Sequence, residues 1–168
     1  IQLAAAGSAL CLGAQPLWAG FQRPGGSNMI SPGCRNSKVK VARLYMGSSH
    51  GLWPKPKLDF QKEIRSYEAA FAGLQDQLAD VDFSVDALVT EPDQVKKLAG
   101  KLKDVDGILA IHFNIGVSPV LTEILSQGKP TMVFAVPYSG HEWVHWGALR
   151  QTPEGARMDC ILSSDLNQ

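Results

Sequence analysis

The sequence predicts an α/β fold, a doubly wound parallel sheet of four to five strands that is flavodoxin-like or Rossmann-like. Short β-rich runs alternate with amphipathic segments from residue 38 to residue 162, and strict alternation of this kind produces a parallel sheet with helices on both faces. The chain has 168 residues, of which 45% are hydrophobic. This size and composition suit a soluble domain with one core.

Residues 1–20 are expected to be an export signal. No charged residue occurs in the first 22 positions, and the run is rich in Ala, Gly and Leu, with the small residues Ala19 and Gly20 at its end. A transmembrane anchor is the alternative, although Gly7, Gly13 and Pro16 interrupt the run. This weakly hydrophobic run resembles the export signals of the twin-arginine route. An exported protein, periplasmic or extracellular, is therefore predicted, with the cytoplasm as the alternative.

Residues 21–37 are dense in Gly, Pro, Ser and Asn and are interpreted as a linker. Residues 38–168 then form the sheet domain. Because the chain starts with Ile1 and stops soon after a strand-like run, we expect this domain to be the first of a longer protein.

The first half of the domain is predicted as strand, helix, strand and helix. Strands are expected at residues 38–47 and 81–89. A helix with one apolar stripe is predicted between them. Thr90 and Pro92 mark the start of the next helix. The stripe has six apolar members at steps of three and four: Phe60, Ile64, Tyr67, Phe71, Leu74 and Leu78.

The second half continues the alternation. Residues 107–113 are a continuous apolar run, which is typical of a strand covered on both faces. A helix is expected from Ser118 to about Gly128, followed by strands at residues 131–136 and 159–162 with a short helix, residues 141–149, between them.

Charge and cysteine content exclude several classes of function. Sixteen basic residues balance 16 acidic ones, which gives no electrostatic footprint for nucleic acid or anionic lipid. No C-x-x-C spacing occurs, so a cysteine zinc site is not expected. The predicted partner is a small neutral sugar, with a homo-oligomer expected and no nucleic acid or stable membrane span.

Polar and aromatic side chains follow the predicted strands. Because ligands bind beyond the carboxyl ends of parallel strands, these side chains should meet at one edge. Indole, imidazole and amide groups without excess charge suit a sugar, whose apolar face stacks while its hydroxyls form hydrogen bonds. The candidate substrate-binding residues are His50, Trp53, His112, Asn114, Tyr138, His141 and Trp143.

Phosphate-binding signatures are missing from the first strand-to-helix loop. Its sequence, GSSHG at residues 47–51, is neither G-x-G-x-x-G nor a P-loop. No nucleotide cofactor is therefore predicted.

An H-E-x-x-H motif at residues 141–145 offers a different chemistry. On a helix, His141 and His145 would share one side and could bind zinc, with Glu142 as the general base of a protease. However, Gly147 comes one residue early for the longer metzincin pattern, and Gln151 occupies its histidine position. A zinc protease is therefore the third hypothesis.

The domain resembles the amino-terminal domain of the L-fucose isomerase and L-arabinose isomerase superfamily over residues 38–150. Three segments carry the resemblance: VARLYMG at 41–47, DGILAIHF at 106–113, and GKPT at 128–131 leading into VPYSGH at 136–141. The resemblance implies a ketol isomerase acting on a sugar, whose divalent metal, such as Mn²⁺, and catalytic residues belong to later domains. It also implies that this domain contributes oligomer contacts and part of a sugar pocket, with no catalytic residue of its own. One lobe of a periplasmic sugar-binding protein is the alternative.

Overall fold

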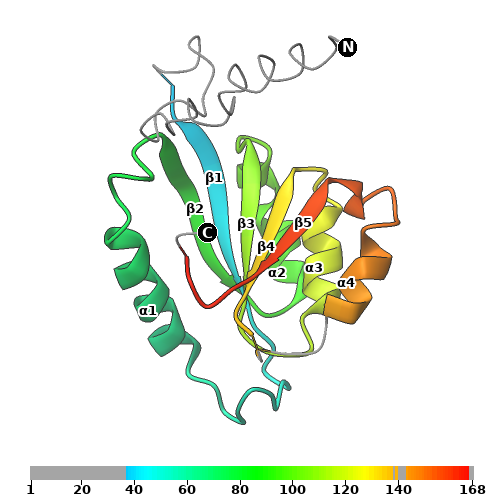
Figure 1. The fold of residues 1–168 in the computed structure, drawn as a ribbon. Coiled ribbons are helices and arrows are strands. Elements are labelled where there is room, and N and C mark those ends of the chain that lie inside the picture. Colours follow the sequence, from blue (N-terminus) through cyan, green and yellow to red (C-terminus); the bar gives the residue numbers. More distant parts are fainter. Residues whose placement is uncertain (1–36, 138, 140–142, 167–168) are drawn as a thin grey trace, which may run out of the picture. The chain divides into compact units, whose positions relative to one another are not determined.

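A five-stranded parallel sheet forms the centre of the protein. The computed structural model describes residues 37–137, 139 and 143–166 (Figure 1). All four strand pairings are parallel, in the order β2-β1-β3-β4-β5. The strands are β1 (Val39–Met46), β2 (Val81–Val89), β3 (Gly107–His112), β4 (Thr131–Ala135) and β5 (Met158–Leu162). The predicted fold class is confirmed, and the strand order is the flavodoxin-like one.

Helices cover both faces of the sheet, as Figure 1 shows. One face packs against α1, and the other against α2, α3 and α4. The helices are α1 (Phe60–Ala72), α2 (Pro92–Leu102), α3 (Ser118–Leu125) and α4 (Trp143–Leu149). Among the described residues, none of these helices has the length and apolar character needed to cross a membrane.

Alternation along the strands sends neighbouring side chains to opposite faces. Leu44 pairs in register with Ala110, and both belong to the core on the α2, α3 and α4 side. The next residues, Tyr45 and Ile111, also pair, and they belong to the aromatic cluster under α1. The sheet is therefore apolar on both faces, which explains why the run at residues 107–113 shows no polar alternation.

The predicted stripe of α1 is longer than the helix itself. The helix ends at Ala72, and the Gly73 N–H donates to the carbonyls of both Ala69 and Ala70. Leu74 and Leu78 therefore lie in the turns at residues 73–80, although each remains half-buried. An N–H shared between two carbonyls tightens the end of a helix. The apolar spacing therefore continues past the last residue of the regular helix.

The start of α2 also differs in detail from the prediction. The N-cap is Glu91, and the capping acceptor is the Gln94 side chain rather than the Thr90 hydroxyl. Gln94 Oε1 accepts from the backbone N–H of Thr90 at 2.6 Å and from that of Glu91 at 3.1 Å. A side chain from the first turn thus reaches back to the residues before the helix, as in a capping box.

Candidate functional site

The strand order creates a topological switch point between β1 and β3. From β1 the chain passes to β2 on one side, and then returns to β3 on the other side. In sheets of this kind a crevice opens beyond the carboxyl ends of the two strands, where ligands bind. The segments concerned are the loop after β1, residues 47–59, and the loop after β3, residues 113–117.

The side chain of Asn114 ties these two loops together. Its Oδ1 accepts from the Ser48 N–H at 2.8 Å, and its Nδ2 donates to the Ser48 carbonyl at 2.8 Å and more weakly to the Gly51 carbonyl at 3.4 Å. Asn114 is only 1% exposed. Since three of the four hydrogen bonds that an amide can make are formed here, Asn114 positions the loop.

Backbone contacts extend the same clamp. The Ile115 N–H donates to the Trp53 carbonyl at 3.2 Å, and the Phe113 N–H donates to the Met46 carbonyl at 2.9 Å. Gly51 is buried against Asn114, and a Cβ at position 51 would collide with the Asn114 amide. The loop after β1 is therefore fixed against the loop after β3 at several points.

Three residues of the fixed loop form what we call the edge cluster: Ser49, His50 and Trp53. Ser49 and His50 are exposed, with the Ser49 Oγ 3.2 Å from the His50 Nδ1. Trp53 is 42% exposed. One loop, whose backbone is fixed by Asn114, thus exposes a hydroxyl, an imidazole and part of an indole ring.

His112 lies at the end of β3 but points into the protein. It is 1% exposed, its Nδ1 lies 2.8 Å from the Ser139 Oγ, and its ring meets the Trp146 ring edge-on with centroids 5.3 Å apart. Trp146 is also buried, and its indole N–H has no hydrogen-bond partner among the described residues. His112 therefore joins β3 to the loop after β4 and to α4, away from the exposed edge cluster.

The remaining predicted residues belong to the segment between β4 and α4. Tyr138 and His141 lie outside the described residues, as does the side chain of Trp143, whose backbone begins α4. His145 is exposed on α4 and lines a 440 Å³ cavity together with Ser118 and Thr122 of α3. Within the described part of the chain, no group of three or more His, Cys, Asp or Glu residues could hold a metal ion. Because His141 and Glu142 are outside that part, the zinc alternative stays untested.

A part-buried ion pair that was not predicted from the sequence lies under α1. Arg43 of β1 pairs with Asp86 of β2, and its Nε donates to the Asp86 Oδ2 at 3.1 Å. The guanidinium lies 4.7 Å from the ring centroids of both Phe71 and Phe83. The available signal was weak: Arg43 interrupts an apolar run in β1, whereas Asp86 is one of three polar residues in β2, and only the register shows that the two are partners.

Two neighbouring tyrosines under α1, Tyr45 and Tyr67, have pKa values shifted mainly by burial. Burial raises the pKa of Tyr45 to about 12, with the Arg43 charge opposing the shift, and burial also raises the pKa of Tyr67 to about 12. The phenol oxygen of Tyr45 is buried, and within the described part of the chain it has no hydrogen-bond partner. Both phenols therefore remain neutral through the physiological range.

Comparisons with known proteins assign this chain to no family. No protein-family model matches the chain, and neither curated proteins nor solved structures give a match.

Proposed function

We propose that this domain binds a neutral sugar at the carboxyl edge of its sheet, with Trp53 and His50 of the edge cluster as the contact residues. The observation that carries the proposal is the half-exposed indole of Trp53 on a loop clamped by Asn114 at the switch point. An indole face packs against the C–H face of a sugar ring, and neighbouring polar groups bond its hydroxyls.

The clamp supports this proposal through preorganisation. A ligand that meets a fixed loop avoids the entropic cost of ordering it, so weak stacking and hydrogen-bonding contacts yield more affinity. The spacing of Ser49 Oγ and His50 Nδ1 adds to this, because a partner at Nδ1 orients the imidazole and leaves its Nε2 for a ligand. Asn114 then positions the loop from inside the protein, and neither Asn114 nor the buried His112 contacts the sugar.

The isomerase resemblance refines the proposal. It would make the ligand an aldose or the corresponding ketose, in a protein that moves a proton between neighbouring sugar carbons with a divalent metal on other domains. The edge cluster would then bind the sugar without taking part in the reaction. A sugar-binding lobe without turnover is the second candidate, and the same edge cluster supports it equally.

The test is a titration of the chain with L-fucose and L-arabinose, with and without Mn²⁺, followed by NMR of the Trp indole N–H signals. We expect saturable shifts of the Trp53 signal, and we expect Trp53→Ala to weaken binding by about 10-fold. Leu52→Ala is the matched control, because Leu52 is 71% exposed on the same loop and should leave affinity unchanged. Absence of saturable binding, or equal binding by Trp53→Ala, would refute the proposal.

A second measurement separates the two candidates. Incubation of the full-length protein, including the later domains that the resemblance implies, with each aldose and Mn²⁺, followed by chromatography of the sugars, reports whether ketose is formed. Turnover would establish the isomerase, whereas sugar binding without turnover by the same protein would favour the sugar-binding lobe.

A further inference from the structure

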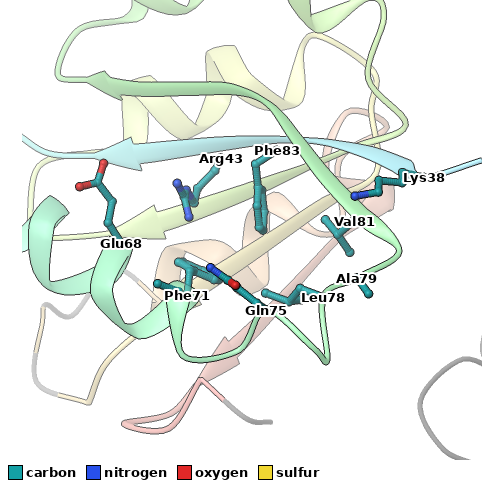
Figure 2. Close-up of a pocket in the computed structure, with 10 residues that line it drawn as sticks. Lys38, Arg43, Glu68, Phe71, Gln75, Leu78, Ala79, Val81 and Phe83 are labelled. Carbon is teal, nitrogen blue, oxygen red and sulfur yellow. The ribbon is translucent and has the colours of Figure 1, made fainter.

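A groove of about 420 Å³ lies between α1, the turns that follow it, and the starts of β1 and β2. Figure 2 shows Phe71 and Leu78 along one wall and Phe83 on the other, with Lys38 and Glu68 at opposite ends. We call it the Arg43 groove. Because Lys38 precedes β1 and Val81 begins β2, the groove lies towards the amino ends of these strands, whereas the edge cluster follows the carboxyl end of β1.

The guanidinium of Arg43 reaches this groove with part of its donor set unused. Its Nε and Nη2 both donate to a single oxygen, Asp86 Oδ2, and Nη1 makes no hydrogen bond with any described residue. The rings of Phe71 and Phe83 hold the guanidinium plane, each at 4.7 Å from Cζ. A planar donor held in this way suits the carboxylate of a ligand, which guanidinium binds with good geometry.

Arg43 is anchored at this position by contacts that leave one edge of its guanidinium for a ligand. The residue is 8% exposed on a sheet face whose neighbours belong to an aromatic cluster. Its partner Asp86 is 36% exposed, and two aromatic rings stabilise the cation, so these contacts offset the cost of taking Arg43 out of water. A guanidinium fixed in this way is positioned to pair with a second carboxylate in the groove.

Glu68 supplies the complementary charge in the same groove. It lines the groove from α1, and Figure 2 shows its side chain together with that of Arg43. A carboxylate and a guanidinium that line one groove match the ammonium and carboxylate of an α-amino acid headgroup. Beyond this pair, Phe83, Leu78 and Val81 supply apolar wall, and Lys38 and Gln75 also line the groove. The apolar part of the wall suits a large apolar side chain.

We propose that the Arg43 groove binds a free α-amino acid with a large apolar side chain. Arg43 Nη1 holds the carboxylate, Glu68 accepts from the ammonium, and the side chain lies along Phe83 and Leu78. This site is independent of the proposed sugar site, so either one can fail without the other.

The experiment is calorimetric titration of the full chain with L-phenylalanine. We expect saturable binding with a dissociation constant of about 1 mM or tighter. Glu68→Gln and Arg43→Lys should each weaken binding by at least about 10-fold. Glu154→Gln, at an exposed position between α4 and β5, is the control and should bind as the parent chain does.

Blocked ligands test the headgroup directly on the parent chain. Phenylalaninamide lacks the carboxylate and N-acetylphenylalanine lacks the ammonium, so neither should bind measurably. Glu68 is exposed, so Glu68→Gln should remain folded even if Arg43→Lys does not. Absence of saturable L-phenylalanine binding, unchanged binding by Glu68→Gln, or equal binding of the blocked ligands would each overturn the proposal.

Discussion

The side chain of Asn114 and the backbone of Ser48 exchange two hydrogen bonds, each 2.8 Å long, across the switch point of the sheet. The first prediction follows from this exchange. Asn114→Ala leaves the buried Ser48 N–H without a partner and removes one of the two donors to the Ser48 carbonyl, which keeps the Gly51 N–H at 3.1 Å. It should therefore lower the free energy of unfolding by about 1–3 kcal/mol. Urea unfolding monitored by circular dichroism measures the change.

Ser48→Ala is the control for this prediction. Both bonds use the backbone of Ser48, and the side chain only accepts a weak bond from the His50 N–H at 3.3 Å. A loss of less than about 1 kcal/mol is expected. Equal losses for the two variants would show that Asn114 does not act through the loop backbone.

Close packing at Gly51 gives a second prediction. A Cβ at this position would collide with the Asn114 amide and the Ile115 carbonyl, so Gly51→Ala should destabilise the fold by about 2 kcal/mol. Gly100→Ala is the contrast, because a Cβ there meets nothing within 4 Å inside α2. That change should stabilise by about 0.5–1 kcal/mol, as Ala has the better helix propensity. The thermal unfolding temperatures of both variants test this prediction. A stabilised Gly51→Ala would contradict the described loop.

The ion pair under α1 gives a third prediction. Asp86→Asn leaves the buried Arg43 guanidinium without a charged partner and should cost about 1–3 kcal/mol, a figure reduced because the Asp86 carboxylate is 36% exposed. Adding Arg43→Met should recover most of this loss, since no uncompensated charge then remains. Asp93→Asn, in an exposed pair with Lys96, should have no measurable effect. A double variant as unstable as the sum of its single changes would argue against the pair.

Stability should fall at high pH, which is the fourth prediction. Burial raises the pKa of Tyr45 and of Tyr67 to about 12 in the folded chain, from an ordinary value of 10.0. The folded state therefore disfavours the phenolates that the unfolded chain forms readily, so this contribution to stability is complete below pH 10 and is lost as the pH rises from 10 towards 12. Urea unfolding across this range, together with phenolate absorbance, measures the effect.

Two single changes assign this pH dependence. Tyr67→Phe and Tyr45→Phe should each reduce the slope of stability against pH. Tyr45→Phe should also leave neutral-pH stability unchanged or slightly higher, because the buried Tyr45 phenol oxygen has no partner among residues 37–137, 139 and 143–166. Ionisation of both phenols near pH 10 in the folded protein would contradict the prediction.

Local pattern was sufficient to predict the elements of the sheet. The strand predicted at residues 81–89 coincides with β2, and the predicted strand at residues 107–113 exceeds β3 by one residue. Apolar runs of this kind are decided by burial on both faces, which the sequence records directly. Helix ends were predicted less well, because Gly73 and Gln94 act through hydrogen bonds whose partners depend on the local backbone path.

The sequence by itself determined the fold class and the gathering of polar groups after the strands, because periodicity and strand polarity are properties of the chain. Only the tertiary structure decided which of those groups face outward. His112 and Asn114 proved to be buried behind the edge, whereas His50 is exposed and Trp53 is 42% exposed. The pairing of Arg43 with Asp86 likewise depended on strand order and register. Neither burial nor register is set by neighbours in sequence, since both arise from contacts between segments that meet only in the folded sheet.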